Sequence, residues 1–130
     1  MVLVDTDVAS FLFRNDHSAT AYAFLEGRNL AISVVTLAEI EYGISLRGWG
    51  ASKRGLMARY LSKYTVIPAQ IETARIWATI SSYRRKIGRP IGYSDGWIAA
   101  TAIQSNLPLV TNNVRDLQHI EGLKVLTATS

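Results

Sequence analysis

The chain opens with a short run of branched apolar residues that two carboxylates follow directly. Val2, Leu3 and Val4 show no polar alternation, and Asp5 and Asp7 come after them. Such a run predicts a strand buried on both faces, as in a parallel sheet that helices cover. In open α/β sheets the functional crevice lies at the carboxyl ends of the strands, so Asp5 is a candidate site residue. The alternative is that either acid only caps the following helix.

The length and the residue types limit the kinds of site. At 130 residues the chain fits one compact domain, residues 1–130, and is too small for two. A hydrophobic fraction of 48% argues against general disorder. The chain has no cysteine and only two histidines, His17 and His119, which argues against a disulfide framework, a thiolate zinc site and a catalytic histidine pair. We therefore expect any bound metal to have oxygen ligands.

The N-terminus does not have the pattern of a secretory signal peptide. Asp5 and Asp7 fall where a basic region and an apolar run would be. The longest mainly apolar run, residues 30–38, is far shorter than the roughly 20 residues that span a bilayer. We expect a cytoplasmic protein without a membrane segment, and the absence of cysteine agrees with this.

Basic residues gather in the middle of the chain. The net charge is +4, but ten of the fourteen Lys and Arg residues lie between residues 47 and 89, with Glu72 as the one acid among them. They are Arg47, Lys53, Arg54, Arg59, Lys63, Arg75, Arg84, Arg85, Lys86 and Arg89. Because phosphate neutralisation dominates nucleic-acid affinity, this asymmetry predicts polyanion binding. The alternative is a set of solvated helix faces, and residues 84–86 would also complement a helix dipole.

The apolar pattern predicts strands that alternate with helices, which is typical of an α/β fold with a parallel sheet. We expect strands over residues 2–4, 30–34, 65–67, 107–110 and 124–126. We expect helices over residues 8–13, 17–25, from 36 onward, 56–63, 70–87, 96–104 and around 116. The positions expected inside the helix 70–87 are Ile71, Ala74, Trp77, Ala78 and Ile80. In the glycine-rich segment 47–55, Trp49 either stacks on a nucleotide or packs over the edge of the core.

Four acids, Asp5, Glu39, Asp95 and Asp116, each stand just after a predicted strand or at the start of a predicted helix. Each has a structural explanation, and Glu39 lies three residues after Thr36, which is the spacing of a capping box. In a parallel α/β layer, however, these positions converge on one end of the sheet. Clustered carboxylates raise one another's pKa unless a cation neutralises them, and Mg²⁺ or Mn²⁺ is the fitting cation. An acidic metal site beside a basic surface predicts a phosphodiesterase.

The chain also resembles the VapC-type PIN-domain ribonucleases, the toxin halves of bacterial and archaeal toxin–antitoxin pairs. The resemblance covers nearly the whole length and is carried by four segments in order, Val4-Asp5-Thr6, Ser33 to Gly43, Gly92 to Ala100, and Leu109 to Asp116. It implies a three-layer α/β/α sandwich with a short parallel sheet of four to five strands. It also implies Mg²⁺- or Mn²⁺-dependent endonucleolytic cleavage of structured RNA, with transfer RNA as a candidate. A homodimer and a cognate VapB-type antitoxin, whose tail enters the acidic groove, are implied as partners.

The resemblance also implies a role for each of the four acids. Asp5 and Asp95 match the principal metal ligands of the family. Glu39 matches an acid that positions the metal or the water. Asp116 matches a fourth, more variable acid that joins the metal ligands.

Three polar residues, Thr6, Thr111 and Asn113, match residues that line the family's pocket. Two positions depart from the family pattern. Asp7 stands where the family commonly has asparagine, which adds a charge to the site, and Leu117 stands where phenylalanine is usual. Because Leu117 directly follows Asp116, the second departure affects how Asp116 is oriented.

Two alternatives start from the same residues. Asp5-Thr6-Asp7-Val8 after an apolar strand also resembles the motif of haloacid-dehalogenase-type phosphatases, with Asp5 as nucleophile and Asp7 as general acid. The region around Asp95 lacks the second acid that such a phosphatase needs. The other alternative is a non-catalytic module that keeps the fold and binds RNA or protein.

Overall fold

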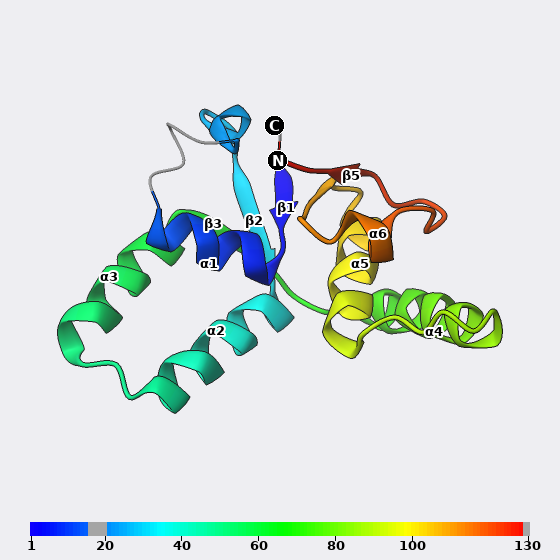
Figure 1. Cartoon of the computed structure of the whole chain (residues 1–130), viewed down its shortest axis with the longest axis horizontal. Helices are drawn as coiled ribbons and strands as arrows, with labels where there is room; N and C mark the ends of the chain where they lie inside the picture. The colour runs from blue at the N-terminus through cyan, green and yellow to red at the C-terminus, as the bar shows by residue number, and fades with distance from the viewer. Residues whose placement is uncertain (16–20, 129–130) are drawn as a thin grey trace.

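The computed structural model describes residues 1–15 and 21–128 of the chain (Figure 1). Strands and helices alternate, as the sequence predicts. In chain order the elements are β1 (Val2–Val4), α1 (Thr6–Arg14), the 3₁₀ turn η2 (Ala23–Leu25), β2 (Leu30–Ser33), α2 (Val34–Arg47), α3 (Ala51–Leu61), β3 (Tyr64–Ile67), α4 (Ile71–Lys86), α5 (Tyr93–Ser105), β4 (Leu109–Val110), α6 (Val114–Leu117) and β5 (Val125–Leu126).

The five strands form one sheet in the order β3-β2-β1-β4-β5, and every neighbouring pair is parallel. β1 is central, and Leu3 pairs with Ala31 of β2 on one side and with Leu109 of β4 on the other. The chain builds outward from β1 to β3 and then returns to the other side of β1 for β4. This reversal makes the carboxyl end of β1 a topological switch point, which is where ligands bind in open α/β sheets.

Alternate residues of the strands face two separate cores. In β1, Val2 and Val4 belong to one core and Leu3 to the other, because successive strand side chains point to opposite faces. Helices α1, α2 and α3 lie on one side of the sheet and α4, α5 and α6 on the other (Figure 1). The predicted three-layer α/β/α sandwich with a short parallel sheet is therefore confirmed. Among the described residues, no helix has the length and apolar character to cross a bilayer.

Two predicted segments differ from the structure on the α1–α3 side. Of the helix predicted over residues 17–25, residues 17–20, including His17, lie outside the described residues, and the turn η2 covers only 23–25. The glycine-rich segment 47–55 is non-helical only over residues 48–50. Gly48 ends α2 with a left-handed φ of 62°, and α3 already begins at Ala51. Trp49 stacks on Phe13 at a centroid distance of 5.9 Å, so it packs over the edge of the core.

The buried face of α4 also differs from the prediction. Ile71 is 74% exposed, and Ala74 and Ala78 are exposed as well. Ile80 is buried as predicted, but the other buried side chains are polar, Thr73 and Arg84. The apolar pattern was misleading here because hydrogen bonds within the protein satisfy these two polar groups, and buried polar groups need such partners. Thr73 bonds the backbone of Gln70 and the side chain of Gln104, and Arg84 bonds the carbonyls of Arg89 and Asp116.

Candidate active site

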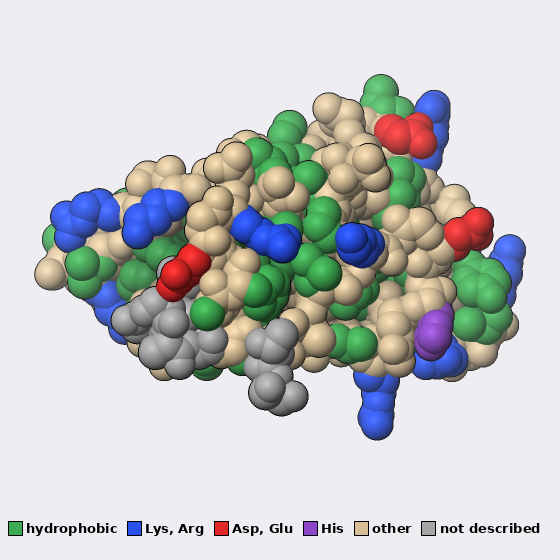
Figure 2. Space-filling model, turned by 90° about the horizontal axis from the view of Figure 1, so that it is seen from above, with side chains coloured by type: hydrophobic (Ala, Val, Ile, Leu, Met, Phe, Trp, Pro, Cys, Tyr) green, Lys and Arg blue, Asp and Glu red, His purple; other side chains and the backbone are tan. Residues whose placement is uncertain are grey.

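The carboxyl ends of β1, β2 and β4 deliver polar side chains to one end of the sheet. Asp5 directly follows β1 and Thr111 directly follows β4. Ser33 is the last residue of β2, and Glu39 lies on the helix that begins after it. α5 brings Asp95 to the same end. The opposite end of the molecule shows scattered basic side chains and only isolated acidic ones (Figure 2).

Asp5 combines a structural and an electrostatic role. It is the N-cap of α1, and its Oδ1 accepts a hydrogen bond from the backbone N–H of Val8 at 2.8 Å. It is also 6% exposed, and burial raises its pKa to about 6. Hydrogen bonds from Thr111 and Val8 oppose this shift, and the charges of Asp7 and Asp95 add to it. A buried carboxylate in this setting gains from a neighbouring cation.

Glu39 is held by a hydroxyl of the neighbouring helix. The Thr6 hydroxyl donates to Glu39 Oε1 at 2.7 Å and lies 3.0 Å from the hydroxyl of Thr36. The capping box predicted for Thr36 and Glu39 is wrong, because Ser33 caps α2 and accepts from the Thr36 N–H at 3.0 Å. Glu39 therefore lies in the second turn of α2 and is free of a capping role. The contact joins α1 to α2 directly beside Asp5.

Asp95 lies within the first turn of α5 rather than at its N-cap. The N-cap is Gly92, whose position provides no side-chain cap, and Asp95 is the third helical residue. Asn113 Nδ2 donates to Asp95 Oδ2 at 3.1 Å, and the Asn113 N–H donates to the hydroxyl of Thr111 at 2.9 Å. Thr111 thus links Asn113 to Asp5. Each of the three residues implied to line the pocket contacts a predicted acid. Thr6 bonds Glu39, Asn113 bonds Asp95 and Thr111 bonds Asp5.

The charges of the acids act on one another's pKa. Burial is the main reason that the pKa of Asp95 is raised, and the charges of Asp116, Asp7 and Glu39 raise it further, against the Asn113 hydrogen bond. Asp7 also acts on the pKa of Asp5. The extra charge expected from Asp7 therefore raises the pKa of both Asp5 and Asp95.

Asp116 is placed by its backbone. Arg84 Nη1 donates to the Asp116 carbonyl oxygen at 2.7 Å, while Arg84 Nε donates to the Arg89 carbonyl at 2.8 Å. Leu117 is almost fully buried in the core on the α4–α5 side and anchors the short helix α6. The substitution of leucine for the family's phenylalanine leaves this anchor apolar. Arg84 therefore serves structure, and only Arg85 and Lys86 of the predicted basic cluster remain exposed.

An aromatic cluster holds the first turn of α5 and was not found from the sequence. The rings of Trp77 and Trp97 are stacked at 5.3 Å with an interplanar angle of 13°, and Tyr93 meets both edge-on. Trp77 also lies against Gly96, where an added Cβ would be 3.1 Å from two atoms of the indole ring. The close approach needs a glycine beside Asp95, because any larger residue would move Trp77 or the helix.

Tyr22 and Asn112 are further neighbours of the site that sequence reasoning missed. The Tyr22 hydroxyl donates to Asn112 Oδ1. Burial is the main reason that the pKa of Tyr22 is raised, and the charge of Asp5 adds to the shift. No motif signals this contact, because the two residues lie far apart in the sequence.

The donor set suits a hard divalent cation. Within residues 1–15 and 21–128, none of the predicted acids forms an ion pair with Lys or Arg. In the same ranges, no three His, Cys, Asp or Glu side chains are close enough to form a ligand cluster of their own. Mg²⁺ typically takes one or two carboxylates and keeps several waters, so it does not require such a cluster. The chemistry of the carboxylates therefore fits Mg²⁺ or Mn²⁺ with water completing the shell.

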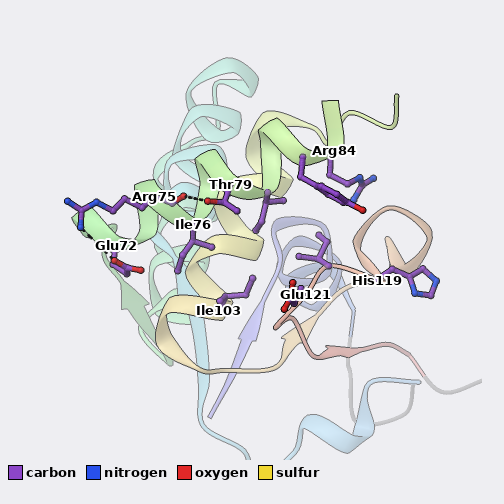
Figure 3. A pocket seen from close by; sticks show the side chains of 11 residues that line it. Glu72, Arg75, Ile76, Thr79, Arg84, Ile103, His119 and Glu121 are labelled. Atoms are coloured by element: carbon purple, nitrogen blue, oxygen red, sulfur yellow. Dashed lines mark hydrogen bonds and ion pairs between the residues drawn. The ribbon is translucent and has the colours of Figure 1, made fainter. Parts of the chain in front are cut away.

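Two hollows differ in their relation to the acids. A groove of about 610 Å³ lies between α1, α2 and α3, and Thr6, Asp7 and Glu39 line one end of it. A cavity of about 510 Å³ lies on the other side of the sheet, between α4, α5 and residues 119–121 (Figure 3). None of the predicted site acids lines this second cavity. Of these two hollows, the groove is the one that reaches a predicted site acid, Glu39, together with Asp7.

Comparison with known proteins identifies the family. Residues 2–123 match the model of the PIN domain. The chain is 34% identical over 130 residues to a Ribonuclease VapC of Rickettsia bellii, covering 97% of this chain and 95% of that protein. It is 28% identical to a tRNA(fMet)-specific endonuclease VapC of Shigella flexneri, covering 94% and 93%.

A solved structure agrees with these relatives. The structure of VapBC-1 from nontypeable Haemophilus influenzae superposes with a TM-score of 0.80 at 26% identity, covering 98% of each chain. The similarity extends over the sheet, both helical layers and the segments that carry Asp5, Glu39, Asp95 and Asp116. The chain therefore belongs to the PIN-domain family and, within it, to the VapC ribonucleases.

Proposed function

We propose that this protein is a divalent-metal-dependent endoribonuclease that hydrolyses phosphodiester bonds of structured RNA and acts as the toxin of a toxin–antitoxin pair. The observation that supports the proposal is that Asp5, Glu39 and Asp95 come from three elements at the carboxyl end of the sheet and that their charges act on one another's pKa. These acids repel one another and lack a basic partner among the described residues. Such a set is costly for a protein unless a cation is bound, which is the requirement of metal-assisted phosphodiester hydrolysis.

Asp5 and Asp95 are the proposed principal metal ligands, and Asp116 joins them. When bound, Mg²⁺ or Mn²⁺ would supply an activated water and stabilise the charge that develops on the scissile phosphate. The protein orients these carboxylates beforehand. Val8 and Thr111 fix Asp5, and the amide of Asn113 fixes Asp95. Because these contacts occupy only part of each carboxylate, lone pairs remain for the cation.

Glu39 is the proposed group that orients the attacking water and takes up its proton. The Thr6 hydroxyl holds Oε1, and Oε2 has no hydrogen-bond partner among the described residues. A carboxylate fixed through one oxygen presents the other in a defined direction. The hydroxyl of Thr36 lies 3.0 Å from that of Thr6 and helps to fix the Thr6 side chain that holds Glu39.

The proposed partners follow from the family. The Shigella flexneri relative is named as specific for tRNA(fMet), and we propose transfer RNA as the substrate class. The Haemophilus influenzae structure is of VapBC-1, and we propose a VapB-type antitoxin that covers the acidic site of this chain. We further propose a homodimer that works in the cytoplasm, where its RNA substrates are.

Cleavage of bulk transfer RNA by the purified protein tests the proposal. We expect cleavage in Mg²⁺ or Mn²⁺, none in excess EDTA, and none with the Asp95→Asn variant, which keeps the shape of the side chain. Circular dichroism of the variant controls for folding. RNA that is bound but left intact by the wild-type protein in all metals would contradict the proposal and favour the non-catalytic module. Hydrolysis of small phosphomonoesters, which the opening motif also suggested, is not expected of a PIN-domain protein.

A further inference from the structure

The charged side chains that line the groove between α1, α2 and α3 change from acidic to basic along its length. Its acid end is lined by Asp7 and Glu39. Farther along, the cations Arg14, Arg47 and Lys53 line it. An anionic strand that runs along the groove would therefore meet cations beside the acidic site, where phosphates are otherwise repelled.

The guanidinium group of Arg47 packs over Gly43 of the same helix. A Cβ added at Gly43 would lie 2.7 Å from Arg47 Nη1, so the guanidinium occupies the space above Gly43. Helical side chains lean toward the N-terminus of their helix, which carries the Arg47 head group back by one turn. Glu39, Gly43 and Arg47 are spaced by four residues and all line the groove. The cation therefore lies one turn of α2 from the proposed proton acceptor.

The helix end does not explain this position. Cations near a helix C-terminus commonly interact with its last carbonyl groups. Here the N–H of Gly48 already bonds the carbonyls of Ile44 and Ser45. Arg47 leans away from that end, and it forms no ion pair within the described ranges. Its guanidinium donors are therefore available to a ligand in the groove.

We propose that Arg47, held on Gly43, binds a phosphate of the RNA strand in this groove, next to the phosphodiester that is cleaved. The inference rests on the proposed ribonuclease function and assigns the path of its substrate. A planar guanidinium presents paired donors that match two phosphate oxygens. Tyr42, which is 67% exposed and lines the same groove, offers a ring face on which an unpaired base can stack. The cations along the groove favour RNA as its occupant over a peptide.

Kinetics on a labelled hairpin RNA tests the assignment. Arg47→Gln is expected to raise KM about tenfold with kcat nearly unchanged, because a phosphate contact away from the reacting bond contributes uniform binding. The slope of log KM against log salt should fall by about 0.7 to 0.9, the value for one phosphate contact. Arg59→Gln on α3 is the matched control, since Arg59 is exposed and does not line the groove. It should change KM by less than about twofold.

The variant Gly43→Ala tests the position of the Arg47 guanidinium without changing its charge. The added methyl group displaces the Arg47 guanidinium but keeps its charge, and alanine favours a helix interior over glycine. We expect KM to rise while Tm stays equal or increases, which a merely structural role would not produce. In the Arg47→Gln background, Gly43→Ala should have no further effect on KM, because both substitutions act through one contact.

Three outcomes would overturn the inference. Equal KM changes for Arg47→Gln and Arg59→Gln would show that only net charge matters. Additive effects of Gly43→Ala and Arg47→Gln would show that the glycine acts elsewhere. Normal cleavage by Arg47→Gln together with lost inhibition by the cognate antitoxin would assign the groove to a peptide. Failure of the wild-type protein to cleave any RNA would instead contradict the proposed function, and the two failures are therefore distinguishable.

Discussion

The N-terminal ends of α1 and α5 each carry an acid of the candidate site, but they hold it in different ways. Asp5 is itself the N-cap of α1 and bonds the helix backbone. Asp95 lies inside the first turn of α5, whose cap is a glycine, and a side chain from another segment holds it. Asp5 thus has a folding role in addition to its proposed role in the chemistry. The position of Asp95 has no folding role of this kind.

The difference shows how one residue type is placed by local and by distant interactions. The orientation of Asp5 follows from four consecutive residues and forms with the helix. That of Asp95 depends on Asn113 and on an aromatic cluster built from α4 and α5. The pKa of each acid is raised, mainly by burial, and the hydrogen bonds from Val8 and Asn113 oppose the shift. Substitutions at the two positions should therefore have the same effect on activity and different effects on stability.

The largest expected effect is common to both positions. Asp5→Asn and Asp95→Asn should each lower the rate of RNA cleavage by on the order of 10³-fold, because each removes a proposed metal ligand. RNA affinity, measured by fluorescence anisotropy at low salt, should stay within about twofold, since phosphate contacts by basic residues dominate it. If RNA affinity collapses in Asp95→Asn, the separation between acids and basic surface is wrong. A wild-type rate in Asp5→Asn would reduce Asp5 to a helix cap.

Stability without metal should depend on pH. The folded-state pKa of Asp5 is about 6, above the ordinary value of 3.8, so the folded state binds a proton more tightly than the unfolded chain. The associated stability is fully present below about pH 4 and is lost as the pH rises through 6. In EDTA, the free energy of unfolding should be larger at pH 5 than at pH 7.5, by about 1.4 kcal/mol from Asp5.

Urea unfolding of Asp5→Asn at the same two pH values controls this prediction. The variant should lose most of the pH dependence, and the remainder should follow Asp95, whose pKa is shifted in the same direction. Mg²⁺ should weaken the dependence in the wild-type protein, because a cation that binds the carboxylates favours their charged form. An equal pH dependence in Asp5→Asn would mean that the buried acid stays charged.

A smaller effect separates the cap from the charge. At pH 7.5, Asp5→Ala should be less stable than Asp5→Asn by about 1 kcal/mol, because asparagine caps a helix as well as aspartate does and alanine does not. At position 95, Ala and Asn should be equally stable or Ala slightly better, since Asp95 caps nothing. Thermal unfolding of the four variants checks this. A lower Tm for Asp95→Ala than for Asp95→Asn would remove the proposed difference between the turns.

The smallest effect concerns the support of Asp95. Asn113→Ala removes the amide that donates to Asp95 Oδ2, and this hydrogen bond lowers the pKa of the acid. We expect a loss of cleavage rate of about threefold to tenfold, together with a shift of the acidic limb of the pH–rate profile to higher pH. The pH–rate profile with and without the substitution is the measurement. A lower rate with an unchanged profile would place Asn113 elsewhere in the reaction.

The strands, and the places where they end, were predicted well from the sequence. Val2 to Val4 are buried on both faces, and Asp5 lies where a parallel sheet puts its functional crevice. The five strands and the α/β/α layers also follow from short apolar runs between helical patterns. These features depend on local periodicity and on the direction of parallel strands, and both can be read from one chain.

The sequence could not show which polar residue completes which contact. Ser33 and Thr36 both suit a helix N-cap, and the choice between them depends on where β2 ends. The capping box expected for Glu39 was wrong for this reason. Arg84 looked like surface charge because its partners, the carbonyls of Arg89 in a loop and of Asp116 in α6, lie in segments whose path no local pattern reveals. Such contacts are decided by tertiary packing.

The central position of β1 affects how the protein assembles during synthesis. β1 leaves the ribosome first, yet one of its two neighbours, β4, lies more than a hundred residues later. Thr111, Asn113 and Asp116 emerge with or after that strand, so an incomplete nascent chain carries Asp5 with its cap bond to Val8 but without the hydrogen bond from Thr111. Nascent chains fold as their segments become available. A ribosome that has not yet made the final fifth of the polypeptide therefore holds a chain whose acidic site still lacks Thr111, Asn113 and Asp116.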